Sequence, residues 1–157
     1  VLDIAKNLDI DVKTLDQHTS VMPETLVLYS TAFPLEGEFR FVIADKQVVA
    51  GSEYRWDGKL DVRRDWPQSC WDLAQKVAEH DWQVDIAYTC DVALLDGEPR
   101  IVELNSFSCA GLYACDLERV VDGISRAAAR AARSGDPVAG LDRAAASGCG
   151  RVTWRLT

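Results

Sequence analysis

The chain has no apolar run close to the roughly 18 residues that a membrane-spanning helix needs. Its amino terminus is acidic and polar, unlike the basic start and apolar centre of a signal peptide. Histidine is scarce, and His18 and His80 lie far from each other and from most of the cysteines, which argues against a zinc site. The five cysteines are odd in number and contain no CxxC pair, as is typical of reduced thiols. These absences predict a cytoplasmic protein with no membrane partner.

The charge balance limits the partners further. The sequence has 25 acidic and 17 basic residues, for a net charge of -8. Such a chain repels a phosphate backbone at long range, so nucleic acid is not an expected partner. A small polyanion such as ATP still fits, because a bound divalent cation reverses the local sign. With 157 residues and 48% apolar content, one domain or part of one is expected.

The first part of the chain predicts a strand and a β-hairpin. Residues 24–30 are short, apolar and rich in strand formers, whereas residues 1–23 fit neither the helical nor the strand period and stay undecided. Residues 38–44 and 47–55 flank Asp45-Lys46 with alternating faces, which predicts a hairpin. Its core face is expected to carry Phe39, Phe41 and Ile43, and its other face Glu38 and Arg40.

The second part predicts two helices and another hairpin. Apolar positions at helical spacing favour a helix over 67–81, and an alanine-rich segment favours another over 112–133. Between them, residues 86–95 and 100–107 are extended runs around a turn signal. Residues 134–157 are expected to be a weakly ordered tail. Together these elements predict an α+β fold, in which a mainly antiparallel sheet has both helices on one face.

The strand predicted over 100–107 carries polar side chains on one face. Side chains alternate along a strand, so Glu103 and Asn105 share a face, while Val102 and Leu104 are expected to face the core. Two oxygen donors are therefore placed side by side.

Asp91 in the preceding strand is expected to join them. If residues 96–98 form a three-residue loop, Asp91 lies directly opposite Glu103 and on the same face. Two carboxylates and an amide oxygen suit Mg2+, which completes its octahedron with waters and substrate phosphates. The alternative from the residues alone is a solvated strand face whose acids serve solubility.

This pattern resembles a known family. An acid, a hairpin and then Glu-x-Asn is similar to the metal-binding signature of the ATP-grasp superfamily, matched here by Asp91, Glu103 and Asn105. The segment 35–42, Leu-Glu-Gly-Glu-Phe-Arg-Phe-Val, also resembles the Gly-x-Glu strand that follows the adenine hinge. The resemblance covers most of residues 24–121.

Two further segments narrow the resemblance. Residues 52–55, Ser-Glu-Tyr-Arg, and residues 105–113 resemble a little-characterised bacterial and phage subgroup of ATP-grasp proteins. The resemblance implies that residues 24–133 are the C-terminal subdomain, or half, of an ATP-grasp fold, with ATP and Mg2+ as cofactors.

The family's roles carry over to matching residues. The resemblance implies that Glu38 binds the ribose hydroxyls and that Arg40 contacts phosphate or the acyl-phosphate. It implies that backbone groups of residues 30–33, ending at Phe33, meet the adenine edge. Asp91, Glu103 and Asn105 would hold Mg2+, and Arg40 and Asn105 would act in catalysis. Residues 105–111 would border the acceptor substrate.

Several residues keep a simpler alternative. Glu38 and Arg40 could form a surface cross-strand ion pair, and Arg55 could be a plain surface arginine as readily as a phosphate contact. Cys109 and Cys115 are expected to be buried small hydrophobes more often than nucleophiles, since no histidine lies nearby in sequence. The tryptophans are expected to pack in the core or at its rim.

The implied reaction is phosphorylation of a carboxylate by ATP, followed by attack of an amine or other nucleophile on the acyl-phosphate. The partners would then be ATP and a small carboxylate or peptide, and a homo-oligomer is compatible with the sequence. The sequence starts at Val1 without a counterpart of the lysine-bearing lobe, which suggests a fragment or processed product with little turnover by itself. The alternatives are a non-catalytic nucleotide-binding or regulatory module, and a plain structural domain.

Overall fold

A computed structural model describes residues 32–134 of the chain. The chain divides into two units, Val1–Phe33 and Pro34–Thr157, and the fold described here is that of the second. The undecided segment 1–23 and the predicted strand over 24–30 lie outside the described residues, as does the predicted tail beyond residue 134.

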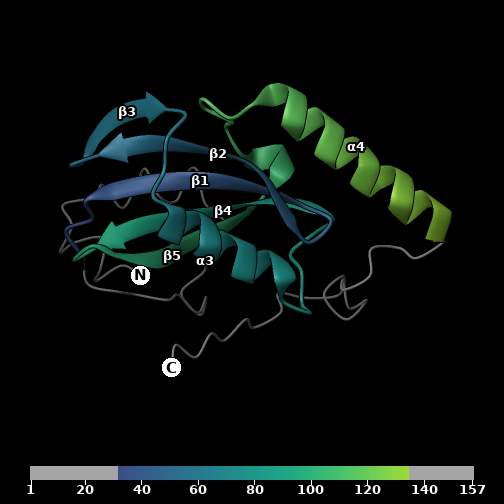
Figure 1. Ribbon diagram of the computed structural model, residues 1–157, viewed down its shortest axis with the longest axis horizontal. Coiled ribbons are helices and arrows are strands. Elements are labelled where there is room, and N and C mark those ends of the chain that lie inside the picture. Colours follow the sequence, from purple (N-terminus) through teal and green to yellow (C-terminus); the bar gives the residue numbers. More distant parts are fainter. Residues whose placement is uncertain (1–31, 135–157) are drawn as a thin grey trace, which may run out of the picture. The chain divides into compact units, whose positions relative to one another are not determined.

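The described part is built on a five-stranded sheet with the order β3-β2-β1-β4-β5 (Figure 1). Every pair of neighbouring strands is antiparallel, which confirms the predicted α+β class with an antiparallel sheet. The strands are β1 Gly37–Ala44, β2 Gln47–Trp56, β3 Lys59–Arg63, β4 Ala87–Leu95 and β5 Glu98–Ser106. Both predicted hairpins, β1–β2 and β4–β5, are present.

Tight turns close the three hairpins of the sheet. Each turn has two central residues with positive φ, the conformation that a type I′ turn requires and that follows the right-handed twist of the strands. Asp45 and Lys46 form the first of these turns, with φ of 52° and 63°. Asp57-Gly58 forms another and starts β3, a strand that the sequence patterns above do not predict.

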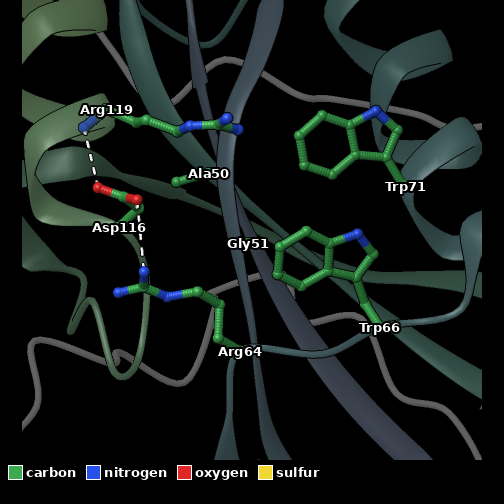
Figure 2. A pocket seen from close by; sticks show the side chains of 7 residues that line it. All are labelled: Ala50, Gly51, Arg64, Trp66, Trp71, Asp116 and Arg119. Carbon is green, nitrogen blue, oxygen red and sulfur yellow. Dashed lines mark hydrogen bonds and ion pairs between the residues drawn. The ribbon is translucent and has the colours of Figure 1, made fainter.

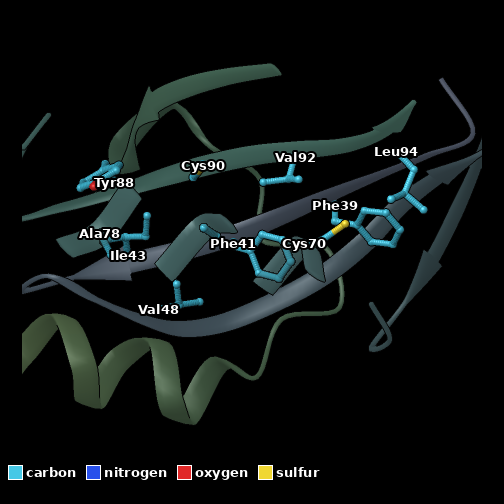
Figure 3. Close-up of a cluster of buried hydrophobic side chains, with 11 residues drawn as sticks. Phe39, Phe41, Ile43, Val48, Cys70, Ala78, Tyr88, Cys90, Val92 and Leu94 are labelled. Atoms are coloured by element: carbon cyan, nitrogen blue, oxygen red, sulfur yellow. The ribbon is translucent and has the colours of Figure 1, made fainter. Parts of the chain in front are cut away.

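Helix α3, Gln68–Glu79, covers one face of the sheet. Its buried residues Cys70, Ala74 and Ala78 are spaced four apart and therefore form one stripe. This stripe packs on the fully buried face that carries Phe39, Phe41 and Ile43, as predicted for those side chains (Figure 3). Cys90, Val92 and Leu94 of β4 extend this core.

Helix α4, Leu117–Ser134, packs on the opposite face. Its Val120 contacts a cluster with Val42 of β1, and Ala127 contacts one with Ala44. The expectation that both helices share a face is therefore wrong, because β1 carries apolar side chains on both of its faces. No helix within residues 32–134 is long and apolar enough to cross a membrane.

Helix α4 also begins later than the predicted residue 112. Asp116 accepts a hydrogen bond at Oδ1 from the backbone N–H of Arg119, three residues on, which caps the first turn. Tyr113 has a φ of 50°, a left-handed conformation that a helix does not contain. The loop before α4 is thereby held in the left-handed region, beside the strands that carry the predicted site.

Candidate functional site

The predicted site residues form a row across the middle of the sheet. Arg40 of β1 lies opposite Asp91 of β4, and Asp91 lies opposite Glu103 of β5. On the other side, Arg40 lies opposite Ser52 of β2. Since partners in register point to the same face, three charged side chains of neighbouring strands meet on the α4 side of the sheet.

The pairing of Asp91 with Glu103 is confirmed, but it arises differently from the expectation. The β4–β5 turn has two residues, Asp96 and Gly97, and not three. A register shift between Asp91 and Val92 then adds one residue on the β5 side. That extra residue is Val102, which is 46% exposed and does not face the core as predicted. Leu104 does pack against the α3-side core.

Arg40 and Asp91 form a buried, two-pronged ion pair. The Arg40 Nε donates to Asp91 Oδ1 over 2.8 Å, and Nη2 donates to Oδ2 over 2.6 Å. The two side chains are 9% and 1% exposed. Arg40 Nη2 also lies 3.6 Å from Glu103 Oε1, and Nη1 donates to the Gly111 carbonyl over 3.1 Å. Such fork-to-fork pairs fix the position of both groups.

Glu38 lies on the same face but pairs elsewhere. Its Oε1 accepts a hydrogen bond from Arg55 Nη1 at 2.9 Å, and its Oε2 accepts one from the Tyr54 hydroxyl at 2.8 Å. The alternative of a surface ion pair between Glu38 and Arg40 is therefore wrong, because both side chains are buried and have other partners. Arg55 is a partner of Glu38 and not an isolated surface arginine.

Two tyrosines enclose the Arg40 guanidinium. The rings of Tyr54 and Tyr113 stack with their centroids 4.9 Å apart and planes inclined by 10°. The central carbon of the guanidinium lies 5.5 Å from the Tyr54 ring and 5.2 Å from the Tyr113 ring, within cation–π range. Sequence reasoning assigned no role to these tyrosines, although both fall in the segments that resemble the bacterial and phage subgroup.

Burial perturbs the ionisable groups of this row. Burial raises the pKa of the Asp91 carboxyl, the hydrogen bonds and charge of Arg40 oppose that rise, and the nearby Glu103 adds to it. The hydrogen bond from Arg40 to Asp91 raises the pKa of the guanidinium. Burial, followed by the charge of Asp91, raises the pKa of Tyr54, so its hydroxyl stays protonated between the Glu38 and Asp91 carboxylates.

The two remaining metal candidates are more accessible. The Glu103 side chain is 51% exposed, and Asn105 is half-buried two residues further along the same strand. Opposite Asn105 lies Thr89, whose Oγ1 is fully buried without a hydrogen-bond partner in the described part of the chain. Residues 32–134 contain no group of three His, Cys, Asp or Glu side chains arranged for a metal ion.

Other predicted residues are not members of this row. Phe33 is 57% exposed and belongs to the first unit, and residues 30 and 31 of the predicted adenine segment lie outside the described residues. Cys115 is buried as expected, whereas Cys109 is exposed because it ends a short 3-10 helix after β5. Trp66 and Trp71 pack against the core, and Trp56 and Trp82 are more than two-fifths exposed.

The fold and the row of charged residues agree with a comparison against protein families. Residues 4–123 match a family model described as an ATP-grasp domain, the second family of its clade, so the chain belongs to this ATP-grasp family. Family membership implies ATP binding and a ligase type of function. The match also begins within the segment 1–23 that the sequence patterns leave undecided. No curated protein matches the chain, and no solved structure does.

Proposed function

We propose that this chain supplies the ATP- and Mg2+-binding half of a carboxylate ligase that works through an acyl-phosphate. The observation that carries the proposal is the row of Arg40, Asp91 and Glu103 across one face of the sheet in an ATP-grasp chain. An amine or other nucleophile would attack the activated carboxylate to give an amide-like bond. The donor would be a small carboxylic acid or peptide.

Each residue has a defined part in this proposal. Glu38 would accept hydrogen bonds from the ribose, and the backbone before and at Phe33 would meet the adenine. Arg40 would contact the phosphates or the acyl-phosphate with its fork of N–H groups, which suits a phosphate as well as a carboxylate. Asn105 would border the reacting groups beside the loop that follows it.

The donor set fits Mg2+ by its chemistry. Asp91, Glu103 and Asn105 offer oxygen atoms alone, and the orphaned Thr89 hydroxyl lies on the same face opposite Asn105. When bound, the ion would offset the negative charge on the transferred phosphoryl group. Both Asp91 oxygens are held by Arg40, so metal binding requires Arg40 to turn toward a phosphate and release part of this carboxylate.

Glu103 offers the sharpest test. Replacing Glu103 by Gln removes a metal ligand from a half-exposed side chain, so Mg2+-dependent ATP binding should weaken by roughly tenfold or more while stability changes little. Calorimetric titration with Mg2+ and ATP measures the first, and urea unfolding the second. Glu98→Gln is a matched control, because Glu98 is an exposed acid on the same strand. Equal Mg-ATP affinity in both variants would contradict the metal assignment.

One observation supports a second candidate, a module that binds nucleotide without catalysis. The buried Arg40–Asp91 pair already satisfies both charges, so the row can be stable with no ion at all. Release of ADP in the presence of amino acids or short peptides separates the two candidates. Acceptor-dependent release supports the ligase, whereas ATP binding without release supports the module.

A further inference from the structure

A pocket beside β2 lies apart from the row of site residues. It has a volume of ≈ 310 Å³ and is lined by Ala50 and Gly51 of β2, by two tryptophans and by three charged residues (Figure 2). None of its lining residues belongs to the proposed ATP and metal site. The pocket therefore calls for a ligand of its own.

One wall of the pocket is aromatic and rigid. Trp66 and Trp71 stack with ring centroids 5.5 Å apart and planes inclined by 17°. Each also meets the buried Phe41 ring edge to face, at 6.0 and 5.9 Å. A Cβ at Gly51 would come within 3.2 Å of the Trp66 ring and 2.8 Å of Phe41, so glycine leaves room for this arrangement. Such a wall offers a flat apolar surface at little entropic cost.

The facing wall is charged, with an excess of positive charge. It carries Arg64, Asp116 and Arg119, so one of its two guanidinium groups is left over in a chain whose net charge is -8. Arg64 is tied down, because it donates to the Ala114 carbonyl over 3.1 Å and lies 3.4 Å from Asp116.

Arg119 is the unneutralised group of this wall. Asp116 is bonded to the Arg119 backbone and not to its guanidinium. Within residues 32–134 the Arg119 guanidinium has no acidic partner. Figure 2 shows its side chain extending toward the tryptophan wall, with Asp116 and Arg64 below it. An arginine fork beside an aromatic surface is a recognition site for a planar carboxylate.

We propose that this pocket binds a small aromatic carboxylate, with its ring against Trp66 and Trp71 and its carboxylate on Arg119 and Arg64. The volume is near the lower end of the roughly 300–1,000 Å³ range of ligand pockets, so it suits a molecule of one or two rings and not a nucleoside triphosphate. The aromatic wall gives the apolar contact, and the left-over guanidinium gives the preference for an anion. This second site is independent of the proposed ligase function.

The test uses the full chain and 2-naphthoate as the probe, with 2-naphthamide, acetate and inorganic phosphate as comparisons. Calorimetry should show binding of the naphthoate that is on the order of tenfold tighter than that of its neutral amide, since a charge-assisted hydrogen bond is lost. Arg119→Gln should weaken naphthoate binding by a similar factor. Trp71→Leu should also weaken it, and circular dichroism checks that this variant is folded.

Two control variants locate the effect. Arg100→Gln changes an exposed arginine on β5, outside the pocket, and should bind naphthoate as the wild type does. Glu103→Gln should do the same, even if it loses Mg-ATP binding, so the failure of one site is distinguishable from the failure of the other. The proposal is overturned if wild-type protein does not bind naphthoate, if Arg119→Gln binds it unchanged, or if phosphate or acetate binds as tightly.

Discussion

Removing Arg40 is the perturbation whose effect the structure defines best. In Arg40→Met, the Asp91 carboxylate keeps its 1% exposure but loses both of its charge-assisted hydrogen bonds. Within the described residues its remaining donor is the Tyr54 hydroxyl, 3.3 Å away and already bonded to Glu38. An uncompensated buried charge of this kind costs about 3–5 kcal/mol of unfolding free energy.

The matched double variant separates the two contributions to this loss. Arg40→Met combined with Asp91→Leu removes both charges and fills the space with apolar groups, so most of the lost stability should return. Urea unfolding followed by tryptophan fluorescence gives the free energies of wild type, both single variants and the double variant. Arg100→Met, an exposed arginine on β5, serves as the control and should change stability little.

Two results would refute this reasoning. An Arg40→Met protein within about 1 kcal/mol of wild type would show that water reaches Asp91 and solvates it. A double variant as unstable as the sum of the two single variants would show that the side chains act independently. Either result would mean that the buried ion pair does not organise this face of the sheet.

Two further predictions concern buried ionisable groups. Burial raises the pKa of Glu53, so the folded chain holds this proton more tightly than the unfolded chain, and the resulting stability is lost as pH rises through the folded pKa. Glu53→Gln should accordingly raise Tm by a few degrees at pH 7 and by less near pH 4; an equal gain at both would contradict this. Burial raises the pKa of the Cys70 thiol to about 11, so at pH 8 iodoacetamide should label exposed Cys109 well before Cys70, as peptide mass spectrometry can measure.

The sheet could be predicted largely because its signals are local. Alternating side chains and tight-turn residues define both long hairpins within a few residues of their observed ends. The strand β3 escaped prediction because its residues 59–63 are mostly polar or exposed and gain their order from pairing with β2. The placement of α4 on the second face also depends on tertiary packing, because Val42 and Ala44 offer a second apolar face beside the first.

The members of the candidate site could be predicted more readily than their partners. Asp91 and Glu103 face each other as the strand period indicates, although a turn one residue shorter and a bulge replace the expected loop. The pairing of Arg40 with Asp91 joins β1 to β4, strands that are 51 residues apart at this point, and no local pattern gives that register. Tyr113 reaches the site from a loop with a left-handed residue, which periodicity does not reveal.

The short turn and the bulge of the β4–β5 hairpin limit how its length can change. One residue added at Gly97 would carry Glu103 to the other side of the sheet, away from Asp91, unless Val102 were deleted at the same time. Insertions and deletions in this hairpin should therefore occur in compensating pairs or in even numbers. Related sequences that carry one more residue in the turn should lack the bulge, so that the two acids stay in register whichever way the extra residue is accommodated.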